Sequence, residues 1–206
     1  MYHGERFNSI THLIGLLLAV AGAAVLVTLA SVQSDTLKIV STSIYGATLI
    51  MLYGVSTLYH SIPGAKPKAI LQKLDHLSIY LFIAGSYTPF TLVALNGTLG
   101  WWLFGIVWGL ALIGITCEFT IAKKTRIPSL LIYLIMGWLI AFAIKDLLLV
   151  MSMPGVVLLA IGGMFYTLGV FFFVLDEKFK HFHGIWHLFV MGGSIFQYFS
   201  ILLYLI

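Results

Sequence analysis

Long apolar stretches separated by short polar connections run the length of the chain. A helix needs about 20 mostly apolar residues to cross a bilayer. Stretches of that kind are expected at residues 8–31, 39–59, 77–95, 99–117, 127–144, 156–175 and 184–206. The pattern predicts an all-α membrane protein whose residues 1–206 form a single bundle of seven transmembrane helices.

Composition supports this prediction. Of the 206 residues, 61% are hydrophobic and only 9% are charged, whereas soluble domains carry about 25% charged residues. The net charge of +4 comes from basic residues that form neither a long run nor a basic helix, so no nucleic-acid partner is expected. The first apolar run is longer than the roughly 7–15 residues of a signal-peptide core, and we interpret it as a retained first helix.

The distribution of lysine and arginine predicts the orientation, because cytoplasmic loops are enriched in both. One side of the predicted bundle holds nine basic residues and the other holds two. The positive-inside rule therefore places the N-terminus in the cytoplasm and the C-terminus outside. The inner set is Arg6, Lys66, Lys68, Lys73, Lys123, Lys124, Arg126, Lys178 and Lys180, and the outer set is Lys38 and Lys145.

All seven histidines fall at predicted cytoplasmic helix ends. His183 and His187 are four residues apart, so on a helix they share one face. His60 ends the second stretch, and Asp75 returns to the same depth across a short connection. Three histidines and a water form a catalytic zinc arrangement, in which Asp75 could hold the water or take its proton. Spacing alone leaves iron and other metals open.

Simpler interpretations compete with a metal site. An isolated histidine at a membrane interface is usually an amphipathic residue at headgroup level, and this is the interpretation of His3, His76 and His181. A pair of histidines four residues apart occurs often by chance and also fits a role in helix packing. Polar residues inside membranes are costly, however, and tend to mark function or mutual pairing.

The motifs around these residues resemble the hemolysin III family, which belongs to the progestin and adipoQ receptor superfamily. The resemblance rests on "GERFNSITHLIG" (4–15), "STLYHSI" (56–62), "KLDHLSIYLFIAGSYTPF" (73–90) and "HGIWH" (183–187), and it covers essentially the whole chain. It implies a seven-helix bundle with the N-terminus inside, which agrees with the charge distribution. The large N-terminal domain of the animal receptors has no counterpart here, so recognition of a protein hormone is not expected.

The resemblance also implies roles for individual residues. Its motif set implies a zinc ion near the cytoplasmic face, with His60, His183 and His187 as ligands. Asp75 would hold the zinc-bound water, and Ser56 would lie beside the site. The same pattern is similar to that of the alkaline ceramidases, which hydrolyse a lipid amide.

Glu5, Asn8 and His12 belong to the first motif. We expect them to cap the first helix and to hydrogen-bond to groups around the metal site, in preference to binding the metal directly.

Three functions fit the sequence. The first is a zinc-dependent hydrolase acting on membrane lipids of a bacterial plasma membrane. The second is a non-enzymatic sensor or receptor of membrane state in which zinc is structural. The third is a pore-forming cytolysin, which is disfavoured because the polar residues gather at one side of the membrane instead of lining a path through it.

Overall fold

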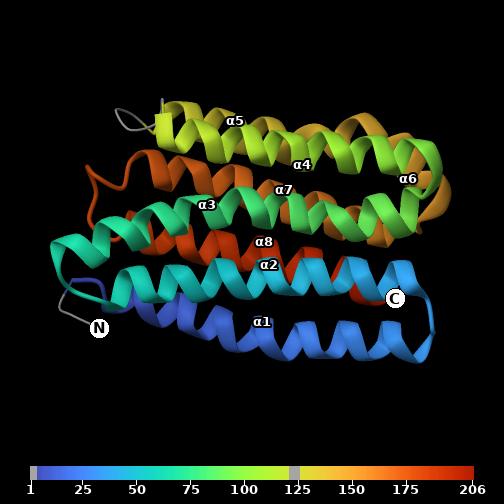
Figure 1. Ribbon diagram of the computed structural model, residues 1–206, viewed down its shortest axis with the longest axis horizontal. Coiled ribbons are helices and arrows are strands. Elements are labelled where there is room, and N and C mark those ends of the chain that lie inside the picture. Colours follow the sequence, from blue (N-terminus) through green and yellow to red (C-terminus); the bar gives the residue numbers. More distant parts are fainter. Residues whose placement is uncertain (1–3, 121–125) are drawn as a thin grey trace.

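The chain forms a bundle of long helices that run roughly parallel and antiparallel to one another (Figure 1). This computed structural model describes residues 4–120 and 126–206, so the predicted positions of His3, Lys123 and Lys124 lie outside the described residues. The helical segments are α1 (Arg6–Val32), α2 (Thr36–Ser61), α3 (Ala65–Pro89), η1 (Phe90–Leu95), α4 (Gly97–Thr120), α5 (Ile127–Trp138), η2 (Leu139–Ala143), α6 (Ile144–Val150), α7 (Met153–Val174) and α8 (Phe182–Tyr204).

These segments make seven candidate membrane spans within the described residues, because η1 continues α3, and η2 and α6 continue α5. The all-helical fold with seven candidate spans confirms the predicted class. Figure 1 shows α1 along one edge of the bundle and α4 and α5 along the other, with α2, α3, α7 and α8 between them. The two termini lie at opposite ends of the bundle. The side of the membrane that each end faces stays a prediction.

The third span begins earlier than the sequence pattern predicts. We expected a helix from residue 77, but α3 begins at Ala65. Pro67 falls in its first turn, where a missing backbone N–H breaks no helical hydrogen bond. At the other end Pro89 is followed by the π-helical segment η1, since proline removes a hydrogen-bond donor from the regular helix.

The fifth span contains a break that the sequence did not predict. Its helix changes to a 3₁₀ segment over Leu139–Ala143 before α6 begins. The Tyr87 hydroxyl of α3 donates a hydrogen bond to the Gly137 carbonyl at 2.8 Å and accepts one from the Ile140 N–H at 2.9 Å. Backbone groups left without helical partners at a break need other partners in an apolar setting. The Tyr87 hydroxyl is the partner of both the Gly137 carbonyl and the Ile140 N–H.

Candidate metal centre

Three histidine rings meet at the end of the bundle that holds the N-terminus. The last turn of α2 carries His60, and the first two turns of α8 carry His183 and His187. One ring nitrogen from each lies within 4.8 Å of the others. His60 and His187 are buried, and His183 is partly exposed. The structure therefore brings together the three residues that the sequence analysis proposed as ligands.

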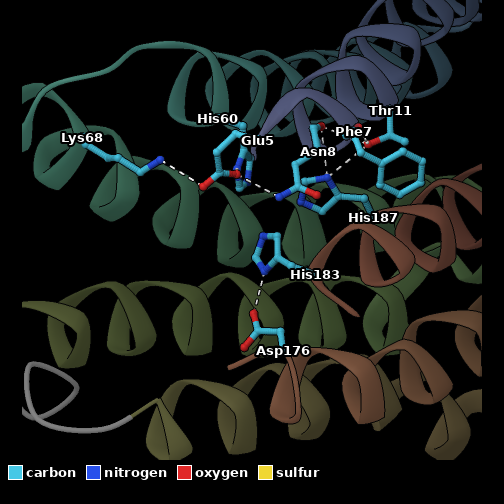
Figure 2. A network of polar contacts seen from close by, with 9 residues as sticks. All are labelled: Glu5, Phe7, Asn8, Thr11, His60, Lys68, Asp176, His183 and His187. Atoms are coloured by element: carbon cyan, nitrogen blue, oxygen red, sulfur yellow. Dashed lines mark hydrogen bonds and ion pairs between the residues drawn. The ribbon is translucent and has the colours of Figure 1, made fainter. Parts of the chain in front are cut away.

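The Nδ1 atom of each of these histidines is held by an oxygen (Figure 2). Two of the acceptors are carboxylates and the third is a backbone carbonyl. The His60 ring donates to Glu5 Oε2 at 2.6 Å, the His183 ring to Asp176 Oδ2 at 2.6 Å, and the His187 ring to the Asn8 carbonyl at 3.2 Å. Histidines that bind metals usually make this kind of bond with the ring nitrogen facing away from the metal.

The opposite ring nitrogens support the same interpretation. The Nε2 atoms of His60 and His183 are buried and have no hydrogen-bond partner among the described residues. A buried polar atom without a partner costs about 1–3 kcal/mol, so such an atom calls for an explanation. A metal ion that accepts these lone pairs would remove the cost, and three imidazole nitrogens are a set that zinc accepts. The residues present therefore fit a metal ion.

The two carboxylates that hold the rings are themselves stabilised in the charged form. Burial alone would raise the pKa of Glu5, but hydrogen bonds from His60 and Asn8 and the nearby Lys68 ammonium lower that pKa to about 2. Burial likewise opposes ionisation of Asp176, yet hydrogen bonds from His183 and Arg126 keep its pKa below the usual value. Both groups are therefore carboxylates at neutral pH and act as acceptors for the imidazole N–H groups.

Close packing of α1 on α8 makes this arrangement possible. Gly184 lies between the two histidines of α8, and a Cβ atom there would collide with the Phe7 ring and lie 2.9 Å from Asn8 Oδ1. Glycine at this position lets the start of α1 approach α8 closely. The approach brings the Asn8 carbonyl to His187 and Glu5 to the same end of the bundle as His60.

Ser56 and Asp75 lie beside the histidines. Ser56 is on α2 one turn before His60 and is buried, and the Asp75 carboxylate of α3 interacts with its hydroxyl. Asp75 is also close enough to His60 and His183 for their charges to interact. Asp75 is outside the group of ring nitrogens that could share one ion. The structure thus places the two predicted catalytic residues next to the histidines, and their roles stay predictions.

These polar groups form one end of a cavity of about 550 Å³ inside the bundle. Beyond the histidines the walls are mostly apolar and come from α2, α3, α5, η2, α7 and α8, with Leu52, Phe82, Ile140 and Leu159 among them. Several wall residues of α5 and α7, including Trp138 and Met164, are also exposed on the outer surface of the bundle. An apolar ligand with one polar end would fit such a space.

The first motif behaves differently from the expectation in two respects. Glu5 and Asn8 hydrogen-bond to the cluster as predicted, but no side chain caps α1. His12 makes no hydrogen bond through either ring nitrogen to a described residue. Its ring stacks on His187 with centroids 3.5 Å apart, so its contact with the site is through the ring face.

Two acidic residues that pair with histidines were not predicted from the sequence. Asp176 sits seven residues before His183, after the end of α7, and only the fold shows that it turns back to that ring. Glu118 lies near the end of α4 and pairs with His76 at 2.7 Å. His76 is therefore partly buried and has a carboxylate partner, and its place at the membrane interface stays a prediction. The sequence feature that could have indicated these two partners is an acidic residue next to, or within, an apolar stretch.

Comparison with known proteins shows similarity over nearly the whole chain. The family model described as "Haemolysin-III related" matches residues 1–198. The chain is 44% identical to the "Hemolysin-3 homolog" of Bacillus subtilis (strain 168), over 97% of this chain and 93% of that protein. It is 43% identical to "Hemolysin-3" of Bacillus cereus, over 98% and 92% of the two chains.

A human relative is also similar. The chain is 32% identical to the "Monocyte to macrophage differentiation factor" of Homo sapiens, over 96% of this chain and 83% of that protein. A multi-pass membrane bundle with a buried three-histidine cluster is the class that fold and site define. The chain belongs to the Haemolysin-III related family.

Proposed function

We propose that this protein is a zinc-dependent hydrolase of lipid amides that works within the membrane. The observation that carries the proposal is the convergence of His60, His183 and His187 at the polar end of an otherwise apolar cavity. Because Nδ1 of each ring is already held by an oxygen, Nε2 is the atom available to a metal. A bound zinc ion would polarise a lipid carbonyl and make water a better nucleophile near neutral pH.

The chain's own residues have separable tasks in this proposal. The apolar walls bind the acyl chain and exclude bulk water from the polar end. Asp75 accepts a proton from the attacking water as a general base. The Ser56 hydroxyl interacts with the Asp75 carboxylate and orients it. Glu5, Asp176 and the Asn8 carbonyl keep the three imidazole rings turned toward one point.

The proposal also places the site at the cytoplasmic face of a bacterial plasma membrane. Seven basic residues of the described chain belong to the end with the histidines by their place in the sequence, and Lys38 and Lys145 belong to the other. A cysteine in place of Lys145 should react with a membrane-impermeant thiol reagent added outside intact cells. Labelling that appears only after the cells are opened would contradict the orientation.

The test of function uses the full chain, purified with its metal and reconstituted in vesicles that contain N-acyl lipids such as ceramide. Release of fatty acid should depend on zinc and stop when a chelator is added. Asp75→Asn should lower the rate by about 10²–10⁴-fold while leaving the zinc content unchanged. Bound zinc without fatty acid release from any N-acyl lipid would reject hydrolysis and favour the non-enzymatic sensor with structural zinc.

A further inference from the structure

A third histidine–carboxylate pair, His76 with Glu118, is separate from the two pairs of the three-histidine cluster. It joins α3, α4 and α5 near the same end of the bundle. His76 Nδ1 is 2.7 Å from Glu118 Oε1, and the Ser129 hydroxyl donates to Glu118 Oε2 at 2.7 Å. The Tyr133 hydroxyl donates to the backbone carbonyl of His76 at 3.0 Å. Hydrogen bonds therefore hold both the ring of His76 and the backbone beside it.

Glu118 is an unusual residue for its position. It lies in a candidate membrane span, and its side chain is only 9% exposed. An acidic group within a membrane span is costly and usually faces a partner or a functional cavity. Both carboxylate oxygens are occupied, one by an imidazole and one by a hydroxyl. The arrangement fixes one tautomer and one orientation of the His76 ring, because the bond at Nδ1 decides the state of Nε2.

The cavity that the three histidines line also reaches His76. His76 lines that cavity together with Asp75 and His60. Among the described residues no hydrogen bond to His76 Nε2 is found, and this atom is not one of the buried polar atoms without a partner. Asp75 is close enough to His60, His76 and His183 to interact with all three charges. Asp75 and His76 are neighbours in the chain, and both line the cavity together with His60 and His183.

We propose that His76 is the proton donor to the leaving group of the lipid, with Glu118 and Ser129 as the residues that position it. The assignment rests on the proposed hydrolase function and adds a second acid–base group to it. A network that only tied helices together would need Nδ1 alone. His76 here also lines the cavity that Asp75, the proposed general base, lines, so both members of an acid–base pair border the same space.

The proton balance is as follows. The water oxygen bonds to the acyl carbon, and Asp75 takes one water proton. The C–N bond then breaks, its electron pair stays on nitrogen, and that nitrogen takes the Nε2 proton of the protonated His76 ring, which keeps its Nδ1–H bond to Glu118. The products are a carboxylic acid and an amine. The proton on Asp75 passes to the neutral His76 ring, which restores both groups for the next cycle.

Substrates with different leaving groups distinguish a proton-donor role of His76 from a structural role. An amide nitrogen must be protonated to leave, whereas a nitrophenolate leaves without a proton. The experiment measures hydrolysis of two substrates with the same acyl chain, an N-acyl amino alcohol and a nitrophenyl ester, by the zinc-loaded full chain in vesicles. His76→Gln should slow amide hydrolysis by about 10²–10⁴-fold and leave ester hydrolysis and zinc content nearly unchanged.

Two further variants keep the test decisive. Glu118→Gln should show the same selectivity with a smaller loss, about 10-fold on the amide, and it serves if His76→Gln does not fold. His181→Asn is the matched control, because His181 is exposed and its ring has no partner among the described residues. Asparagine also tolerates the left-handed backbone at this position, and this variant should hydrolyse both substrates like the wild type.

Failure of the His76 assignment and failure of the hydrolase proposal would give different results. Equal losses on both substrates, or no loss on the amide, would overturn the assignment of His76 and leave the hydrolase proposal standing. A wild type that hydrolyses neither substrate would overturn the hydrolase proposal, and the assignment with it.

Discussion

Helix α8 takes part in two buried polar clusters that differ in how far their hydrogen bonds are satisfied. The first is the histidine cluster. The second begins seven residues after His187, where the Tyr53 hydroxyl donates to Ser194 Oγ at 2.8 Å and Ser194 donates to the Val190 carbonyl at 3.0 Å. Tyr166 OH lies 3.0 Å from the same Ser194 oxygen.

The clusters differ in whether buried polar atoms remain without hydrogen-bond partners. The hydroxyls of Tyr53, Ser194 and Tyr166 all have partners, so this second cluster ties α2, α7 and α8 together without needing a ligand. The histidine cluster leaves Nε2 of His60 and His183 buried and unpaired among the described residues. Burial of polar groups does not by itself mark a binding site. Buried ring nitrogens that lie close together and lack partners, as at His60 and His183, call for an explanation that a bound metal ion supplies.

Removal of the metal should separate the two clusters most strongly. A ligand that binds only the folded state stabilises it by about 4 kcal/mol when its free concentration is 1,000 times its Kd. Chelation should therefore lower the unfolding temperature of the wild type markedly. The double variant His183→Ala, His187→Ala should unfold at the same temperature with or without chelator. An equal response of the two proteins to the chelator would contradict the metal site.

Loss of a carboxylate behind a histidine should weaken metal binding without abolishing it. Asp176→Asn keeps the shape of the side chain but weakens its bond to His183, so zinc affinity should fall about 10–100-fold. Glu177→Gln is the matched control, because Glu177 pairs with the same Arg126 at 2.9 Å but makes no bond to a histidine. Competition with a chelating dye measures both affinities. Equal affinity losses in the two variants would show that Arg126, and not His183, mediates the effect.

Added volume at Gly184 should separate α1 from α8. The Cβ of Gly184→Ala would press on the Phe7 ring and on Asn8. Overpacking of this kind costs about 1–3 kcal/mol, and it should also lengthen the bond between His187 and the Asn8 carbonyl. Thermal unfolding and zinc affinity should therefore both fall. Gly163→Ala is the control on α7, since its added Cβ has no neighbour within 4 Å.

A substitution in the second cluster, formed by the hydroxyls of Tyr53, Ser194 and Tyr166, should have the smallest effect. Tyr53→Phe removes one donor to Ser194 and should cost about 0.6 kcal/mol, the average for such bonds between membrane helices. The zinc content should stay at the wild-type level, because the cluster holds helices and not a ligand. A loss of zinc in Tyr53→Phe would show that the two clusters are coupled along α8.

The sequence predicted the parts of this molecule that depend on local pattern. Apolar length located the seven spans, and helical spacing with the family motifs located His60, His183 and His187. Partners that depend on packing were not predictable in this way. Asp176 reaches His183 only through the turn between α7 and α8, and Glu118 reaches His76 only because α4 packs on α3. The break in α5 likewise depends on the Tyr87 hydroxyl, which comes from another helix.

We infer that His60, His183 and His187 hold one metal ion through their free ring nitrogens. Elemental analysis tests it most directly, on protein purified in mild detergent with neither added metal nor a histidine tag. We expect about one zinc ion per chain in the wild type and none in the His183→Ala, His187→Ala double variant. A folded wild type without metal, or a double variant that retains the same amount, would contradict it.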